Sequence, residues 1–177
     1  LALIALQFIY ENEFVNAAWF IALSMICDFL DGKLARLLNA ISKFGATFDT
    51  LADFVAFGVV PAFLAYKVSL YQIKTIGFII TILYVLAGGF RLVRFSLTNI
   101  NPTKKNPFIG LPIPAAAGTI SSFVILNFYL WERVKSPDIF SAVVLISALL
   151  MISKIEYLPI EKGKKLTKET KLFIIMG

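Results

Sequence analysis

The sequence predicts an all-α fold, a polytopic membrane helix bundle of about six transmembrane helices. Of its 177 residues, 59% are hydrophobic and 14% aromatic, whereas only 16% are charged. Soluble globular domains carry about 45–50% apolar and about 25% charged residues. The apolar residues gather in runs close to the roughly 20 residues that a helix needs to cross a bilayer. We therefore expect a single membrane-embedded domain over 1–177, truncated at both ends because the first and last residues fall within apolar runs.

Six apolar runs define the expected helices. In chain order they cover approximately 1–10, 15–38, 44–66, 73–97, 111–131 and 137–153. The main polar interruptions are 11–13, the short link 39–43 and a loop at 99–110 that is rich in Asn, Pro and Gly. Pro61 is expected to kink the third helix, whereas two prolines of the fifth helix fall in its first turn, where a missing N–H is tolerated.

Basic residues are concentrated at one set of helix ends. Thirteen of the 17 Lys and Arg residues lie in three regions: the second and third helices where they approach their link, the fourth and fifth helices where they approach their loop, and the tail after the sixth helix. By the positive-inside rule these ends are cytoplasmic. We therefore expect a multi-pass protein of the cytoplasmic membrane. This topology also accounts for the net charge of +6. Because no soluble face interleaves basic and aromatic residues, we expect no nucleic-acid partner.

The contents of His and Cys exclude several kinds of site. The chain has no His, which rules out imidazole catalysis and His-ligated metals. Its single cysteine, Cys27, excludes an internal disulfide and a thiolate zinc cluster. We expect Cys27 to be a packing residue.

Four aspartates interrupt the apolar runs of the second and third helices. They are Asp28, Asp31, Asp49 and Asp53. One carboxylate at the bilayer centre costs about 2.5–3.5 kcal/mol, so four require compensation. At 100° per residue, each pair shares a helix face with small residues, which let membrane helices approach closely. We therefore expect the four carboxylates to converge in the cytoplasmic half of the membrane.

Four converging carboxylates need a cation. Oxygen ligands select hard ions, here Mg²⁺ or Mn²⁺, with Ca²⁺ as another occupant. Two such ions about 3.5–4 Å apart clamp a phosphoryl group during its displacement. The expected substrate is a phosphate or pyrophosphate ester whose other end stays in the lipid. Arg36 can bind a phosphate bidentately, and Gly32 and Ala35 leave room beside the ions.

Two other interpretations of the aspartates compete with this one. A lone intramembrane Asp can be a packing residue or a proton relay, and carboxylates also line cation pathways. The spacing of four aspartates among small residues argues against a purely structural role. A divalent-cation transporter is the less favoured alternative, because the distal halves of the two helices, 15–26 and 54–66, contain almost no polar groups.

The stretch 28–53 resembles the signature of the CDP-alcohol phosphotransferases. Its matching positions are Asp28-x2-Asp31-Gly32-x2-Ala35-Arg36-x8-Gly45-x3-Asp49-x3-Asp53. Two further stretches, 91–118 and 152–157, resemble the phosphatidylserine synthase branch of that family. Its members are membrane enzymes of about six helices, often homodimers, which transfer the phosphatidyl part of a CDP-linked lipid to an alcohol and release CMP.

The resemblance implies a reaction and a role for each matching residue. The donor would be CDP-diacylglycerol or its archaeal ether-lipid equivalent, and the acceptor L-serine; the alternative acceptors are glycerol 3-phosphate and inositol phosphate. The implied metal ligands are Asp28, Asp31, Asp49 and Asp53, and the implied CDP-binding residues are Gly32, Ala35, Arg36 and Ser42. Asp53 would also be the general base. The residues by themselves favour neither Asp49 nor Asp53 as base, and they assign no role to Ser42.

A serine acceptor needs a cationic partner for its carboxylate. Arg91 and Arg94 are three residues apart, so they share one helix face at the cytoplasmic end. We expect at least one of them to bind the serine carboxylate bidentately. The alternative is that both only anchor the helix at the lipid headgroups.

Overall fold

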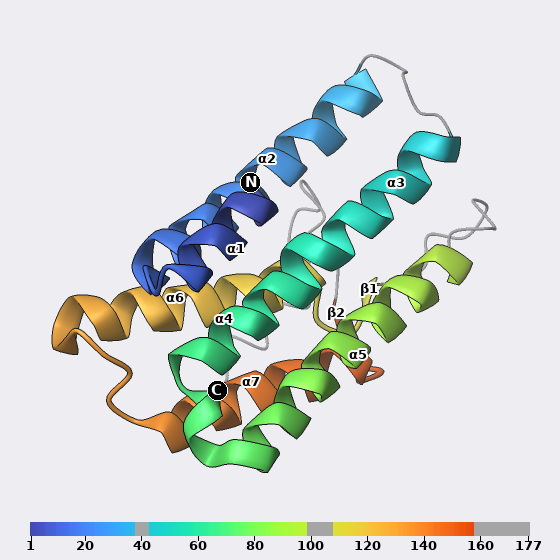
Figure 1. The fold of residues 1–177 in the computed structure, drawn as a ribbon. Helices are drawn as coiled ribbons and strands as arrows, with labels where there is room; N and C mark the ends of the chain where they lie inside the picture. Colours follow the sequence, from blue (N-terminus) through green and yellow to red (C-terminus); the bar gives the residue numbers. More distant parts are fainter. Residues whose placement is uncertain (38–42, 99–107, 158–177) are drawn as a thin grey trace, which may run out of the picture.

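The computed structural model describes residues 1–37, 43–98 and 108–157. Figure 1 shows these residues as a bundle of helices. The elements are α1 (Ala2–Tyr10), α2 (Phe14–Leu37), α3 (Lys43–Asp53), the π-helical turn η1 (Phe54–Val59), α4 (Val60–Val68), the 3₁₀ turn η2 (Leu70–Ile73), α5 (Lys74–Thr98), β1 (Phe108–Ile109), α6 (Ile113–Trp131), α7 (Pro137–Ile152) and β2 (Glu156–Tyr157). All six expected helical segments are confirmed. The third is divided into α3, η1 and α4.

Four helical stretches of the described chain are long and apolar enough to cross a membrane. They are Phe14–Leu34, Thr47–Val68, Leu70–Leu97 and Ile113–Trp131. Helix α7 has 16 residues and is shorter than the usual span. The nine residues of α1 rise only about 14 Å. Of the roughly six membrane-spanning helices that we expected, four therefore meet the requirement by length and composition.

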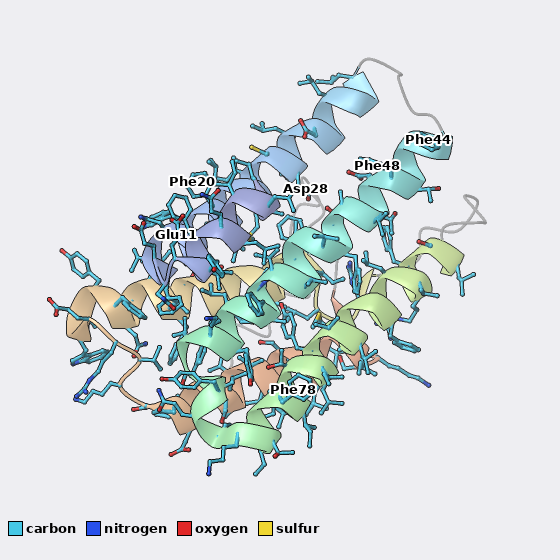
Figure 2. All side chains as sticks on the ribbon, in the orientation of Figure 1. Glu11, Phe20, Asp28, Phe44, Phe48 and Phe78 are labelled. Carbon is cyan, nitrogen blue, oxygen red and sulfur yellow. The ribbon has the colours of Figure 1, made fainter. Side chains whose placement is uncertain are left out.

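The outside of the bundle is apolar. Phe44 and Phe48 on α3 are 82% and 63% exposed, and Phe78 on α5 is 53% exposed; Figure 2 labels all three. Large exposed apolar surfaces are unusual on soluble monomers. On helices of this length they are expected to face lipid, where apolar side chains are in their preferred environment.

Small residues bring α2 close to α6. Ala116 and Ala117 of α6 are fully buried, and a Cβ added at Gly118 would lie 3.0 Å from Cε of Met25 on α2. Small side chains permit such close approach of membrane helices. The contact holds α2 in place one turn before Asp28.

A π-helical turn interrupts the third expected helix, where the sequence predicts a kink at Pro61. The turn η1 follows Asp53 directly, and Pro61 lies in the first turn of α4. Because proline has no N–H, the carbonyl of Phe57 loses its usual helical donor. The buried hydroxyl of Tyr84 on α5 donates to this carbonyl instead, at 3.2 Å. The helix that carries Asp53 is thereby tied to α5.

A short antiparallel pairing joins the segment before α6 to the segment after α7. In it, Phe108 of β1 lies opposite Tyr157 of β2, and Ile109 opposite Glu156. Two-residue strands have no periodic pattern that a sequence could reveal, and we did not predict them. The pairing brings the beginning of α6 and the end of α7 together.

Candidate functional site

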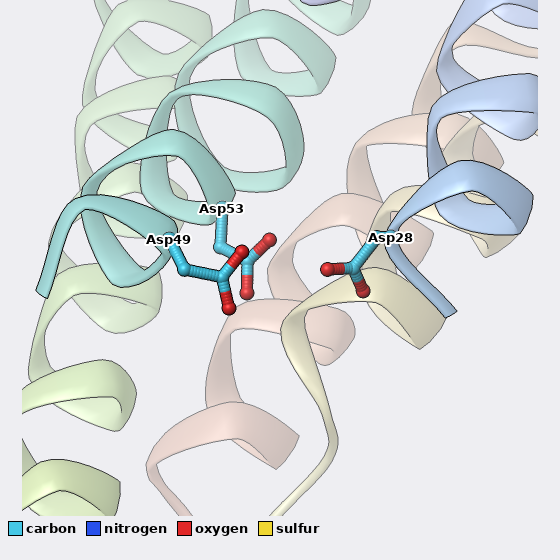
Figure 3. A group of neighbouring side chains, drawn as sticks. All are labelled: Asp28, Asp49 and Asp53. Carbon is cyan, nitrogen blue, oxygen red and sulfur yellow. The ribbon is translucent and has the colours of Figure 1, made fainter. Parts of the chain in front are cut away.

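Three of the four aspartates come together between α2 and α3. Asp28 projects from α2 toward Asp49 and Asp53 on α3 (Figure 3). Each residue offers one carboxylate oxygen, and these three atoms lie within 4.8 Å of one another. Asp28 and Asp53 are partly buried, whereas Asp49 is exposed. We call Asp28, Asp49 and Asp53 the acidic group.

Local sequence spacing explains the positions of Asp49 and Asp53 relative to each other. Asp49 and Asp53 are four residues apart in α3, so their side chains lie above one another on one face. Asp28 comes from a different helix, and only the tertiary arrangement of α2 relative to α3 brings it within reach (Figure 1). The C-terminal end of α2, the N-terminal end of α3 and the C-terminal end of α5 lie at the same side of the bundle.

Asp31 does not belong to the acidic group, although we expected four carboxylates to converge. It is exposed on α2 and close enough to Asp28 for an electrostatic interaction. A spacing of three residues turns the helix by about 300°, so the side chain is rotated about 60° from Asp28 and displaced by about 4.5 Å along the axis. A role for Asp31 as a metal ligand stays a prediction.

The residues expected to bind CDP are only partly described. Gly32 is partly buried in α2. Ala35 and Arg36 belong to the same helix, but their side chains lie outside the described part of the structure, as does the whole of Ser42. The assignment of these four residues to CDP stays a prediction.

The acidic group has a strongly unbalanced charge. Asp53 interacts electrostatically with Asp28 and Asp49, which are repulsive partners, and with Arg91, which is attractive. Among the described side chains, the one guanidinium that interacts with Asp53 cannot balance three carboxylates in a partly buried site. Oxygen ligands at this separation fit hard divalent cations, which complete their coordination with water or phosphate oxygens. The donor set therefore fits Mg²⁺ or Mn²⁺.

The two arginines of α5 have different surroundings. Arg91 is 8% exposed, its guanidinium lies 5.4 Å from the ring centre of Phe95, and it interacts electrostatically with Asp53. Arg94 donates hydrogen bonds to the carbonyls of residues 151–153 at the end of α7, at 3.1–3.2 Å. The structure thus separates two residues that the sequence treated as equivalent, because Arg91 faces the acidic group and Arg94 the end of a neighbouring helix.

A cavity of about 880 Å³ lies between α3 and α5, beside the acidic group. Its polar lining is formed by Asp49 with the nearby hydroxyl residues Thr47, Thr50 and Ser96, and its apolar lining includes Phe54. These three hydroxyl residues were not among the site residues predicted from the sequence. Their signal was present as polar residues within one turn of Asp49 or Arg94, but only the tertiary structure shows that they line the same cavity.

Comparisons with known proteins agree with the geometry. A profile of the CDP-alcohol phosphatidyltransferase family matches residues 1–155. The chain is similar to a protein of Helicobacter pylori strain 26695 named CDP-diacylglycerol–serine O-phosphatidyltransferase, with 38% identity over 99% of this chain and 73% of the relative. A protein of the same name from Bacillus subtilis is 37% identical over 88% of this chain and 81% of the relative.

An archaeal relative is similar to a smaller part of the chain. A protein of Methanothermobacter thermautotrophicus named archaetidylserine synthase is 40% identical over 81% of this chain and 58% of its own length. The profile match over most of the sequence, the apolar helices and the acidic group between α2 and α3 all agree. The chain is therefore a multi-pass membrane protein that belongs to the CDP-alcohol phosphatidyltransferase family.

Proposed function

We propose that this protein transfers the phosphatidyl group of CDP-diacylglycerol, or of its archaeal ether-lipid equivalent, to the hydroxyl of L-serine and releases CMP. The observation that carries the proposal is the acidic group, whose three carboxylates meet between two membrane-length helices. This placement suits a reaction in which one substrate is anchored in lipid and the other is soluble. The names of the bacterial relatives point to serine as the acceptor.

Divalent metal ions are the cofactors that this donor set fits. Asp28, Asp49 and Asp53 would hold them, with Asp31 as a further ligand. When bound, the ions would neutralise the pyrophosphate of the donor and make CMP a better leaving group. We propose two ions, Mg²⁺ or Mn²⁺, with the CDP part contacted by Gly32, Ala35, Arg36 and Ser42.

The position of Arg91 favours Asp53 over Asp49 as the general base. Arg91 and Asp53 interact electrostatically across the space between α5 and the third helix. A serine whose carboxylate binds Arg91 bidentately would hold its hydroxyl only a few bonds away, next to Asp53. Asp53 then accepts the hydroxyl proton as the serine oxygen attacks the lipid-side phosphorus, and the bond from that phosphorus to CMP breaks. Asp49 is exposed toward the cavity, which suits a ligand of the ions.

We also propose an orientation of the protein in the membrane and an oligomeric state. We propose that the acidic group lies toward the cytoplasm. The support is that the basic ends of α2, α3 and α5 lie on the same side of the bundle as the acidic group, as the positive-inside rule expects of cytoplasmic ends. We further propose that the active form is a homodimer in the cytoplasmic membrane. Chemical cross-linking in native membranes, followed by mass analysis, would reveal a single monomer mass if the homodimer is wrong.

One assay tests the proposed reaction. The purified protein is incubated with CDP-diacylglycerol, Mn²⁺ or Mg²⁺, and serine, glycerol 3-phosphate or inositol phosphate in turn, and CMP release is measured. We expect CMP with serine and none from the Asp53→Asn variant. CMP with glycerol 3-phosphate alone would refute serine as the acceptor, and no CMP with any acceptor would refute the transferase proposal.

A further inference from the structure

The guanidinium of Arg94 caps the C-terminal end of α7. Its Nη1 donates to the carbonyl oxygens of Ile152 and Ser153 at 3.1 and 3.2 Å, and its Nη2 donates to that of Met151 at 3.2 Å. The last carbonyls of a helix have no helical N–H partner. A planar guanidinium has five donors and a positive charge, both of which suit this end of the helix.

Gly110 packs directly against this guanidinium. Its φ angle is +79°, and a Cβ at this position would lie 2.5 Å from Nη2 of Arg94 and 2.7 Å from the carbonyl oxygen of Met151. The N–H groups of Gly110 and Leu111 donate to the carbonyls of Ile155 and Leu150, at 2.9 and 3.0 Å. Both the backbone angle and the available space therefore require glycine.

These contacts join three parts of the chain at one point. We call Arg94, Gly110 and the carbonyls of residues 151–153 the Arg94 anchor. It ties the end of α5 to the end of α7 and to the segment that leads into α6. The pairing of β1 with β2 continues directly from it.

The anchor lies one helical turn beyond Arg91. Both arginines belong to α5, and a spacing of three residues rotates one by about 60° from the other and separates them by about 4.5 Å along the axis. The bonds of Arg94 hold this end of α5 against the end of α7. If they were lost, α5 could rotate or tilt, and the guanidinium of Arg91 would move relative to Asp53, with which it interacts.

We propose that Arg94 is a positioning residue that acts through Arg91. The Arg94 anchor holds α5 in the rotation at which Arg91 faces Asp53 and can receive the carboxylate of the acceptor. This inference rests on the proposed transfer to serine. It differs from direct binding of serine by Arg94, because the donors of Arg94 are directed to the carbonyls of α7.

Three variants perturb the anchor from two sides. Arg94→Ala removes the guanidinium, Arg94→Lys keeps the charge with a single point donor, and Gly110→Ala displaces the guanidinium by steric contact. The matched controls are Arg133→Ala, at an exposed arginine between α6 and α7, and Gly88→Ala, where a Cβ would meet only ordinary contacts of 3.6 Å and more. If Arg94→Ala does not fold, Arg94→Lys and Gly110→Ala carry the test.

The expected result is a selective loss of affinity for the acceptor. Arg94→Ala and Gly110→Ala should each raise the KM for serine about tenfold while changing the KM for CDP-diacylglycerol by less than about twofold, with a smaller effect for Arg94→Lys. The thermal shift produced by CDP-diacylglycerol with Mn²⁺ should be kept, which shows that the variants are folded. An equal loss for both substrates, or an unchanged KM for serine, would overturn the inference.

A double-mutant cycle tests the route through Arg91. If Arg94 acts through Arg91, Arg94→Ala should have little further effect on kcat/KM for serine once Arg91→Ala is present. Additive effects would mean that Arg94 contributes independently of Arg91, and the inference would be wrong. Failure of the proposed function is distinguishable, because the wild-type protein would then release no CMP with serine in the same assay.

Discussion

The acidic group and the Arg94 anchor are two charged regions of one helix bundle. They differ in whether groups of the protein itself satisfy the charge. In the acidic group, one oxygen from each of three carboxylates lies within 4.8 Å of the others, and Arg91 is the described cation that interacts with Asp53. In the anchor, one guanidinium is matched by three carbonyl oxygens of the same chain. In the anchor the carbonyl oxygens satisfy donors of the cation within the protein, whereas clustered carboxylates require a cation from outside the group. This difference distinguishes residues that bind a ligand, in the acidic group, from residues that position a helix, in the anchor.

The largest expected effect is at the acidic group. Asp53→Asn should lower the rate of CMP release by about 10²–10⁴-fold, because a general base is lost. The melting temperature in the absence of metal should not fall, because the substitution removes one of three mutually repelling charges. Activity assays and thermal unfolding in detergent measure the two effects, with Asp138→Asn at the exposed start of α7 as the control. A variant that is both inactive and destabilised would mean that Asp53 is part of the structural framework.

Metal removal should also distinguish the acidic group from the Arg94 anchor. A chelator should abolish activity, and Mn²⁺ at about 100 times its dissociation constant should stabilise the wild-type protein by about 2.7 kcal/mol. Asp49→Asn should lose most of this stabilisation, whereas Arg94→Lys should keep it because Arg94 lies outside the acidic group. Thermal unfolding with and without Mn²⁺ measures it. Equal stabilisation of wild type and Asp49→Asn would place the ions elsewhere.

Substitutions in the Arg94 anchor should mainly lower the stability of the protein. Gly110→Ala should destabilise the protein by about 2 kcal/mol or more, because a side chain at positive φ is strained and its Cβ collides with Arg94 and Met151. Gly88→Ala, with its ordinary contacts, should differ from wild type by less than about 0.5 kcal/mol. Thermal or denaturant unfolding in detergent compares them. If Gly110→Ala were as stable as Gly88→Ala, the close packing around Arg94 would be contradicted.

The smallest effect is expected at Tyr84, whose hydroxyl supports the helix that carries Asp53. Tyr84→Phe should cost about 1 kcal/mol, because the carbonyl of Phe57 would lose its donor in a buried position. In a Pro61→Ala background the cost should shrink, since residue 61 regains an N–H for that carbonyl. A double-mutant cycle on the unfolding free energy checks this. Equal effects in both backgrounds would show that Tyr84 contributes through packing alone.

Much of the fold could be predicted because the relevant signals are local. Apolar run lengths determined the helical segments, and the four-residue spacing of Asp49 and Asp53 determined that their side chains share a face. The signature over 28–53 resembles the family to which the chain was found to belong. Each of these depends on neighbouring residues, for which helical geometry alone is sufficient.

Other features were decided only by contacts between distant parts of the chain. The same helical periodicity paired Arg91 with Arg94 and Asp28 with Asp31, yet the structure gives the members of each pair different surroundings. Arg94 meets carbonyls 57 to 59 residues away, and Gly110, at a φ of +79°, packs against both the guanidinium and these carbonyls. Residue spacing determines which side chains share a helix face. Only tertiary packing decides what that face meets, because the rotation of a helix depends on its neighbours.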